Sequence, residues 1–212
     1  VSIMGQIELP EVTRKRMAGL LSLLKTWPED KITSAAISGS TGWKDSLIRH
    51  DLWLLGFNKG VSNGYRKDEL QNAISQALGI ETKEESDKSS NDGRNCCIVG
   101  LGRLGAALLD DEFTDGSSFK IKAGFDSNLY RVEVLRSTFP LYPASEMNRV
   151  IKELGIEYAI LTVKNESAAA MAQKLVDAGI KGIVNMTNIV LNVPKNVKVQ
   201  HLSILNALNL VI

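Results

Sequence analysis

Cysteine, histidine and long apolar runs are scarce in this sequence of 212 residues. Its two cysteines, Cys96 and Cys97, are adjacent. Neighbouring residues of a strand point to opposite faces, so we expect buried free thiols rather than a bridge between them. The two histidines, His50 and His201, lie far apart, and no Cys/His spacing is typical of zinc. We therefore predict no metal site.

Membrane-spanning and secretory segments are also missing from the expected organisation. No apolar run approaches the ~20 residues that a spanning helix needs. Residues 1–11 lack a basic start followed by an apolar stretch, so we expect no secretory signal, no membrane partner and a cytoplasmic location. The formal net charge is only +1. Any contact with nucleic acid must then depend on local clusters such as Arg14-Lys15-Arg16.

A polar stretch over residues 81–94 divides the chain. It has almost no apolar residues and is rich in Ser, Asn, Asp, Glu and Lys. Such a stretch buries too little apolar surface to offset its ordering entropy, which predicts a flexible linker. We expect one domain over residues 1–80, a second over 95–200 and a separate C-terminal helix over 201–212.

The first domain has apolar residues at helical spacing. We expect inward-facing residues on the third of its helices, at Leu47, Ile48, Leu52 and Leu55. The order helix, short helix, turn, helix and hairpin is that of a winged helix-turn-helix, a DNA-reading motif. A three-helix cluster with no DNA role remains the alternative. The predicted elements are helices over 13–27, 33–38, 45–55 and 68–78, a glycine turn over 39–42 and a hairpin-like tip over 58–64.

The second domain alternates strands with helices. This alternation predicts an α/β fold with a doubly wound parallel sheet, as in a Rossmann domain. An apolar stretch over 202–212 predicts the final helix. The other predicted elements are strands over 96–99, 119–125, 158–163, 182–185 and 197–199, and helices over 104–110, 147–154 and 167–178.

A glycine motif, residues 100–105 (GLGRLG), directly follows the first of these strands and opens a helix. In this context Gly100 permits a tight turn, Gly102 lets a pyrophosphate approach the backbone, and Gly105 lets the helix pack on the strand. The helix start offers N–H groups to phosphates. Asp126 ends the next strand, and an acid there binds ribose hydroxyls and favours NAD(H) over NADP(H). The alternative is a motif kept for packing that binds nothing.

Catalytic equipment for a dehydrogenase is missing from the second domain. Hydride transfer needs an acid or base beside the substrate, usually in a cleft made with a substrate domain. The domain has a single histidine, His201, no Tyr-x-x-x-Lys pair and no substrate domain. We predict no catalytic residues and no enzyme, with a small nucleotide-dependent enzyme as the alternative.

Several segments together resemble the Rex family of redox-sensing repressors. They are residues 98–105 (IVGLGRLG), 159–163 (AILTV), 175–185 (LVDAGIKGIVN), 191–194 (LNVP), 10–13 (PEVT) with Arg16, 48–52 (IRHDL) and 64–65 (GY). The resemblance implies a homodimer in which the helix over 202–212 swaps onto the partner. It implies binding to a pseudo-palindromic double-stranded operator when NAD⁺ predominates and release when NADH accumulates, through rotation of the two Rossmann domains.

The motifs and the resemblance together assign two sets of residues. Arg49 is the leading candidate for a base or phosphate contact, because an arginine on a recognition helix can donate two hydrogen bonds to guanine. The alternative is a solvated surface arginine. The predicted NADH/NAD⁺ contacts are Gly100, Leu101, Gly102, Arg103, Leu104, Gly105, Asp126, Thr162, Val163, Lys164, Asn185 and Met186. The predicted DNA contacts are Arg14, Arg16, Ser46, Arg49, His50, Lys59 and Tyr65.

Several positions depart from the family pattern. Asp111 stands where the family has a tyrosine near the nicotinamide, and Ser203 where it has an aspartate of the redox switch. Met186 begins a segment that is Phe-Ala-Pro in the family, and Lys164 replaces a proline. These departures support an alternative, a divergent repressor that has lost NADH sensing or responds to another nucleotide.

The DNA-reading part departs as well. His50 replaces a basic residue of the family, and Val61 replaces a wing arginine. Because His50 is mostly neutral at pH 7, we expect fewer fixed charges against the phosphates and a shallower salt dependence. Trp53 stands where the family is more polar, and we expect it in the core or at a dimer contact.

Overall fold

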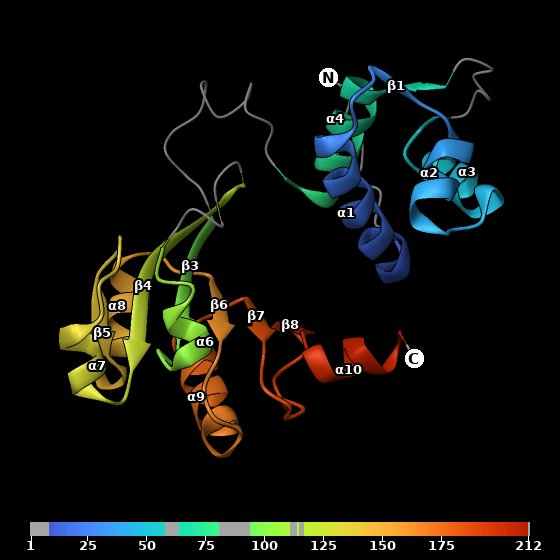
Figure 1. The fold of residues 1–212 in the computed structure, drawn as a ribbon. Helices are drawn as coiled ribbons and strands as arrows, with labels where there is room; N and C mark the ends of the chain where they lie inside the picture. Colours follow the sequence, from blue (N-terminus) through green and yellow to red (C-terminus); the bar gives the residue numbers. More distant parts are fainter. Residues whose placement is uncertain (1–8, 58–63, 81–93, 111–113, 115–116, 212) are drawn as a thin grey trace. The chain divides into compact units, whose positions relative to one another are not determined.

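The computed structural model describes residues 9–57, 64–80, 94–110, 114 and 117–211. The chain divides into two compact units, residues 1–90 and 91–212 (Figure 1). The division falls in the polar stretch 81–94, most of which lies outside the described residues. Each unit is described by itself.

The N-terminal unit consists of helices and one small sheet. Strands β1 and β2 pair antiparallel, with Ile32 opposite Tyr65. Residues 58–63 of the hairpin tip expected over 58–64 lie outside the described residues. In chain order the elements are α1 (Glu11–Thr26), β1 (Lys31–Ile32), α2 (Ser34–Thr41), α3 (Asp45–Leu54), β2 (Tyr65–Arg66) and α4 (Lys67–Leu78).

The core of this unit comes from one face of each long helix. Its fully buried side chains include Met17, Leu20 and Leu24 of α1, Ile48 and Leu52 of α3, and Leu70 and Ile74 of α4. The prediction that these α3 residues face inward is therefore right for Ile48 and Leu52. It is wrong for Leu47, which is 36% exposed, and Leu55 is half-buried. Trp53 is 57% exposed and does not belong to the core.

Helix α2 is longer than predicted. Thr33 caps its start, where the side-chain oxygen accepts a hydrogen bond from the backbone N–H of Ala36 at 3.0 Å. The helix continues through Thr41, so the predicted turn over 39–42 is wrong up to that residue. It ends at Gly42, whose φ of 72° is the left-handed conformation that glycine adopts at helix ends.

The C-terminal unit holds a six-stranded sheet, and all its strand pairs are parallel. The strand order is β5-β4-β3-β6-β7-β8. With β3 as the first strand of the unit, this is the order 3-2-1-4-5-6 of dinucleotide-binding sheets. The predicted doubly wound sheet is confirmed. The strands are β3 (Arg94–Val99), β4 (Phe119–Asp126), β5 (Leu141–Pro143), β6 (Tyr158–Leu161), β7 (Gly182–Asn185) and β8 (Lys198–His201).

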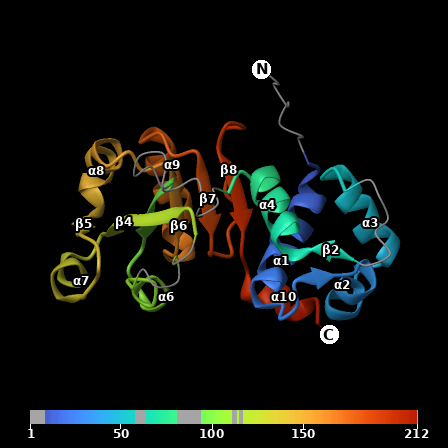
Figure 2. The same cartoon turned by 90° about the horizontal axis from the view of Figure 1, so that it is seen from above.

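Helices cover both faces of this sheet. Helices α8 (Met147–Glu153) and α9 (Asn165–Asp177) lie on one face and α6 (Arg103–Ala106) on the other (Figure 2). Cys97 packs on the α8 and α9 side, and Cys96 belongs to the core on the other side. Burial raises the pKa of the Cys96 thiol to about 12 and raises that of Cys97 further. Both are thus buried free thiols, as predicted.

Some elements of this unit differ from the predictions. Helix α6 ends at Ala106 rather than 110, because the chain turns to bury Leu109, whose carbonyl accepts a hydrogen bond from the Ser137 hydroxyl at 3.2 Å. Helix α10 (Ile204–Asn209) is shorter than 202–212, and Ser203 caps its start. The elements that were not predicted are β5, α7 (Leu129–Val134) and the short 3₁₀ helix η2 (Ala144–Glu146).

Among the described residues, no helix is both long and apolar enough to cross a bilayer. Within the same part of the chain, no group of three or more His, Cys, Asp and Glu side chains is placed to hold a metal ion.

Candidate functional site

The glycine motif forms a tight loop between β3 and α6. Gly100 has a φ of 97°, and a Cβ there would lie 2.7 Å from the Val163 side chain. A Cβ on Gly105 would overlap the carbonyl oxygen of Gly100. The Thr162 hydroxyl donates a hydrogen bond to that same carbonyl at 2.6 Å. Two glycines and one threonine therefore hold the loop against the end of β6.

The middle glycine of the motif has a different environment. A Cβ on Gly102 would meet no atom within 4 Å, and Gly102 borders a cavity of about 620 Å³. This cavity lies at the carboxyl ends of β3, β4 and β6, where the strand order reverses and doubly wound sheets bind ligands. Its lining consists of Val99, Gly100, Gly102, Arg103, Phe125, Asp126, Ser127, Asn128, Arg131, Ala144, Thr162, Val163, Lys164, Ser167 and Met171.

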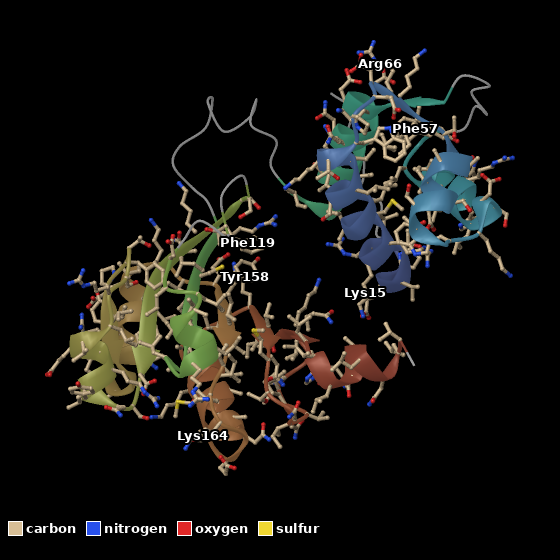
Figure 3. All side chains as sticks on the ribbon, viewed as in Figure 1. Lys15, Phe57, Arg66, Phe119, Tyr158 and Lys164 are labelled. Atoms are coloured by element: carbon tan, nitrogen blue, oxygen red, sulfur yellow. The ribbon has the colours of Figure 1, made fainter. Side chains whose placement is uncertain are left out.

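Figure 3 labels side chains at the two ends of the sheet. Lys164, a lining residue, lies where α9 begins. Phe119 and Tyr158 lie at the opposite end, where their strands start and their rings meet edge to face at 5.4 Å. The aromatic pair is therefore a packing contact away from the cavity.

Asp126 lines the cavity, and both of its carboxylate oxygens accept hydrogen bonds from the protein itself. Its Oδ2 accepts a hydrogen bond from the backbone N–H of Leu101 at 2.7 Å, and its Oδ1 accepts one from that of Asn128 at 2.7 Å. Arg131 of α7 lies 3.3 Å from Oδ2. Asp126 is only 5% exposed. It links the glycine loop to the start of α7 as well as lining the cavity.

Some predicted nucleotide contacts lie elsewhere. Leu101 is buried in the core, and Leu104 is 41% exposed; neither lines the cavity. Asn185 and Met186 do not line it either. The Asn185 amide donates to the Ile189 carbonyl at 2.7 Å and lies 3.0 Å from Nδ1 of His201, so this side chain organises its own loop. Asp111 lies outside the described residues.

The outer face of α3 presents a second candidate site. Ser46, Arg49, His50 and Trp53 are exposed and recur at the spacing that places residues on one helix face. The Arg49 guanidinium lies 2.6 Å from the Asp45 carboxylate and donates to the Ser34 hydroxyl at 3.3 Å. Its side chain remains 66% exposed. Three predicted DNA contacts and the exposed Trp53 thus share this face.

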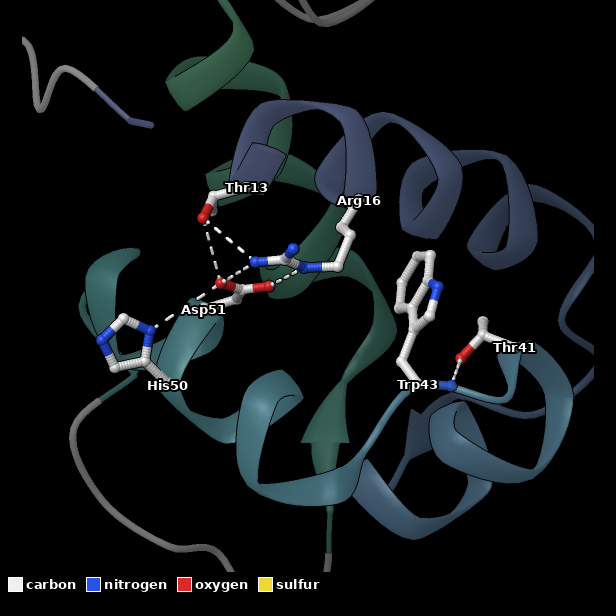
Figure 4. Close-up of polar contacts among 6 residues, drawn as sticks. All are labelled: Thr13, Arg16, Thr41, Trp43, His50 and Asp51. Atoms are coloured by element: carbon white, nitrogen blue, oxygen red, sulfur yellow. Dashed lines mark hydrogen bonds and ion pairs between the residues drawn. The ribbon is translucent and has the colours of Figure 1, made fainter. Parts of the chain in front are cut away.

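The other predicted DNA contacts that the structure describes, Arg14, Arg16 and Tyr65, have partners within the unit. Figure 4 shows Arg16 of α1 facing Asp51 of α3; Arg16 Nε donates to the carboxylate at 2.6 Å and Nη2 donates at 2.8 Å. Pairing with Asp51 raises the pKa of Arg16. Arg14 donates to the last carbonyls of α4 at 3.4 Å. Tyr65 is 8% exposed and packs edge to face on Phe57.

Comparison with known proteins covers nearly the whole chain. The chain is 31% identical over 212 residues to the redox-sensing transcriptional repressor Rex of Limosilactobacillus reuteri. The match covers 99% of this chain and 94% of that protein. The chain is 29% identical over 208 residues to Rex of Listeria monocytogenes, covering 97% and 92%. The chain belongs to the Rex family.

Solved structures of Rex repressors resemble it as well. The complex of RSP with NAD⁺ and operator DNA matches with a TM-score of 0.81 at 26% identity, over 96% of this chain and 90% of that one. The complex of RSP with NADH matches with a TM-score of 0.79 at 27% identity, over 96% and 92%. The family model described as a CoA binding domain matches residues 91–189.

The last positions to place are Lys59, Ser203 and the cavity residues that were not predicted. Lys59 lies outside the described residues. Ser203, at the position of the family's switch aspartate, accepts a hydrogen bond from the Asn206 N–H at 3.3 Å and so caps α10. Sequence reasoning missed Ser127, Asn128 and Arg131 on the cavity wall. They follow Asp126 closely, and their position after a strand that ends at the cavity was the available signal.

Proposed function

We propose that this protein is a repressor that binds operator DNA as a homodimer and leaves it when NADH rises. It acts in the cytoplasm, where the DNA is. The observation that carries the proposal is the open backbone at Gly102, beside a cavity at the point where the strand order reverses. Relatives named as redox-sensing repressors support it over the whole chain.

We assign the domains as the sequence predicts them. Residues 1–80 are the winged-helix DNA-binding domain, 81–94 the linker, 95–200 the Rossmann NAD(H)-binding domain and 201–212 the dimerisation helix. Helix α10 supports the last assignment, because Ile204, Leu205 and Leu208 are each more than half exposed on it. Exposed apolar surface of this kind marks a protein interface. A second copy of the chain is its proposed partner.

The cavity residues fit a nicotinamide dinucleotide. At Gly102 a pyrophosphate can approach the backbone, and Arg103 and Lys164 bring positive charge to the same cavity. Thr162 positions the glycine loop through its bond to the Gly100 carbonyl. The bound dinucleotide supplies the redox signal, in that its reduced and oxidised forms bind with different affinity. The chain's own task is to bind the two forms and convert that difference into a domain movement.

On the DNA side, the exposed face of α3 is the proposed reading surface. Arg49 is long enough to exchange Asp45 for a guanine edge or a phosphate. Ser46 and His50 flank it on the same face. Arg16 contributes through Asp51, by holding α1 against this helix.

The first test of this function uses a Gly102→Ala variant. Gly102 has φ −69° and ψ −165°, which alanine also adopts, and the added methyl meets no protein atom. We expect normal folding but an NADH affinity lowered about 10- to 100-fold, the cost of lost hydrogen bonds to a charged group. Titration of the intrinsic NADH fluorescence measures this affinity.

The same variant tests the coupling to DNA. We select a duplex from a random pool with the wild-type protein and follow its release as NADH is added. NADH is expected to release the wild type and to fail with the variant at the same concentration. Release of both proteins at equal NADH would contradict the placement of the pyrophosphate. If the wild type binds the duplex but ignores NADH, the second candidate holds, a Rex-like repressor without redox sensing, which the cap role of Ser203 favours.

A second prediction concerns Arg49→Gln. Loss of a base-reading arginine costs about 1–3 kcal/mol, so affinity for the selected duplex should fall roughly 5- to 150-fold at fixed salt. Unfolding should change by less than about 0.5 kcal/mol, because the ion pair with Asp45 is exposed. Arg149→Gln is the matched control, since it also removes an exposed arginine from ion pairs within a helix, but in the other unit. Equal duplex affinity for the two variants would remove Arg49 from the reading surface.

A further inference from the structure

Asp126, the acidic residue that should discriminate between dinucleotides, is paired with an arginine in this chain. A free carboxylate at the end of the second strand accepts ribose hydroxyls and repels a ribose phosphate. Here the Asp126 carboxylate is 5% exposed and has three partners, the N–H groups of Leu101 and Asn128 and the guanidinium of Arg131. Its negative charge is therefore paired with the Arg131 guanidinium before any ligand binds.

The wall beside Asp126 presents donors to the cavity. Ser127 and Asn128 are exposed and line it, and the Arg131 side chain is 43% exposed. A guanidinium has five N–H donors, so Arg131 can keep one on Asp126 and direct others to a phosphate. Arg next to the ribose site is the arrangement that accommodates a 2′-phosphate.

The remaining charges of the cavity point the same way. Among its described lining residues, the charged ones besides Asp126 are Arg103, Arg131 and Lys164, all cationic. Arg103 and Lys164 suffice for the two charges of a pyrophosphate. Arg131 then remains for a further anionic group on the adenosine half of the ligand.

We propose that this cavity accepts a phosphate on the adenosine ribose and so binds NADPH as well as NADH. The proposal rests on the proposed function, in that the cavity holds a dinucleotide. It replaces the sequence-based expectation that Asp126 favours NAD(H) over NADP(H). The 2′-phosphate would lie against Arg131, with the Ser127 hydroxyl and the Asn128 amide as further donors.

The first test compares NADH and NADPH on the full chain. Both reduced dinucleotides carry the same fluorescent nicotinamide, so one titration method serves for both. We expect the two dissociation constants to agree within tenfold. We also expect 2′,5′-ADP to displace NADH at lower concentration than 5′-AMP, from which it differs only by the 2′-phosphate. NADPH binding more than tenfold weaker than NADH binding would overturn the inference, and so would displacement by 5′-AMP at the lower concentration.

A variant of Arg131 tests whether this side chain is responsible for NADPH binding. In Arg131→Gln the ratio of NADPH affinity to NADH affinity should fall about tenfold. In the control Arg136→Gln, which removes an exposed arginine that does not line the cavity, the ratio should stay at the wild-type value. An unchanged ratio in Arg131→Gln would overturn the role given to Arg131. If the wild type binds neither dinucleotide, the proposed function fails; if it binds NADH alone, only this inference fails.

Discussion

Replacing Arg16 by methionine is expected to destabilise the N-terminal unit by about 3–5 kcal/mol. Asp51 is 1% exposed, and its carboxylate receives two hydrogen bonds from the Arg16 guanidinium. Without Arg16, its remaining partners are the Thr13 hydroxyl at 3.1 Å and His50 at 3.8 Å. Methionine keeps much of the apolar stem, so the loss reports on the unpaired buried charge.

Tryptophan fluorescence during urea unfolding measures this loss. All three tryptophans, Trp27, Trp43 and Trp53, lie in the N-terminal unit, so the signal reports on that unit. Arg49→Met, which breaks an exposed pair, should cost less than about 1 kcal/mol. The double variant Arg16→Met with Asp51→Leu should recover most of the lost stability, since it removes both charges. A loss of less than 1 kcal/mol in Arg16→Met would show that Asp51 is not held by this pair.

The Arg16–Asp51 pair also shows what local patterns leave out. The family resemblance pointed to Arg16 as a DNA contact, and its basic neighbours supported that prediction. Its partner is 35 residues away in the sequence, and nothing in the spacing of either helix indicates the contact. Sequence periodicity predicted α1 and α3 well because each has a continuous apolar face. A charge pair between two helices leaves no such trace.

The same reasoning explains the uneven prediction of the Rossmann unit. Strands with buried alternate or continuous apolar residues, such as β3 and β7, were located closely. Helix α7 has no buried residues and β5 has three half-buried ones, so neither carries an apolar pattern. The residues that change the interpretation of the cavity, Ser127 to Arg131, lie in this unpatterned segment. The glycine spacing located the site, while its selectivity depends on contacts visible only in the fold.

Within the glycine motif, Gly105→Ala should have a far larger effect on folding than Gly102→Ala. A Cβ on Gly105 would overlap the Gly100 carbonyl and lie 2.8 Å from the Thr162 hydroxyl oxygen. The overlapped atom is a backbone oxygen that accepts a hydrogen bond from the Thr162 hydroxyl just after the end of β6, so it cannot move aside cheaply. We expect a loss of at least about 3 kcal/mol in the Rossmann unit, the upper range for overpacking.

Circular dichroism during thermal unfolding, with and without NADH, separates the two glycine variants. In Gly105→Ala, the Rossmann unit should unfold at a lower temperature than in the wild type, and NADH should raise this temperature only slightly. Gly102→Ala should unfold at nearly the wild-type temperature in the absence of NADH, because its methyl meets no protein atom, yet gain less from NADH than the wild type does. A Gly105→Ala protein as stable as Gly102→Ala would mean that α6 does not pack this closely on the loop. The contrast divides the motif into a glycine needed for the fold and a glycine needed for the ligand.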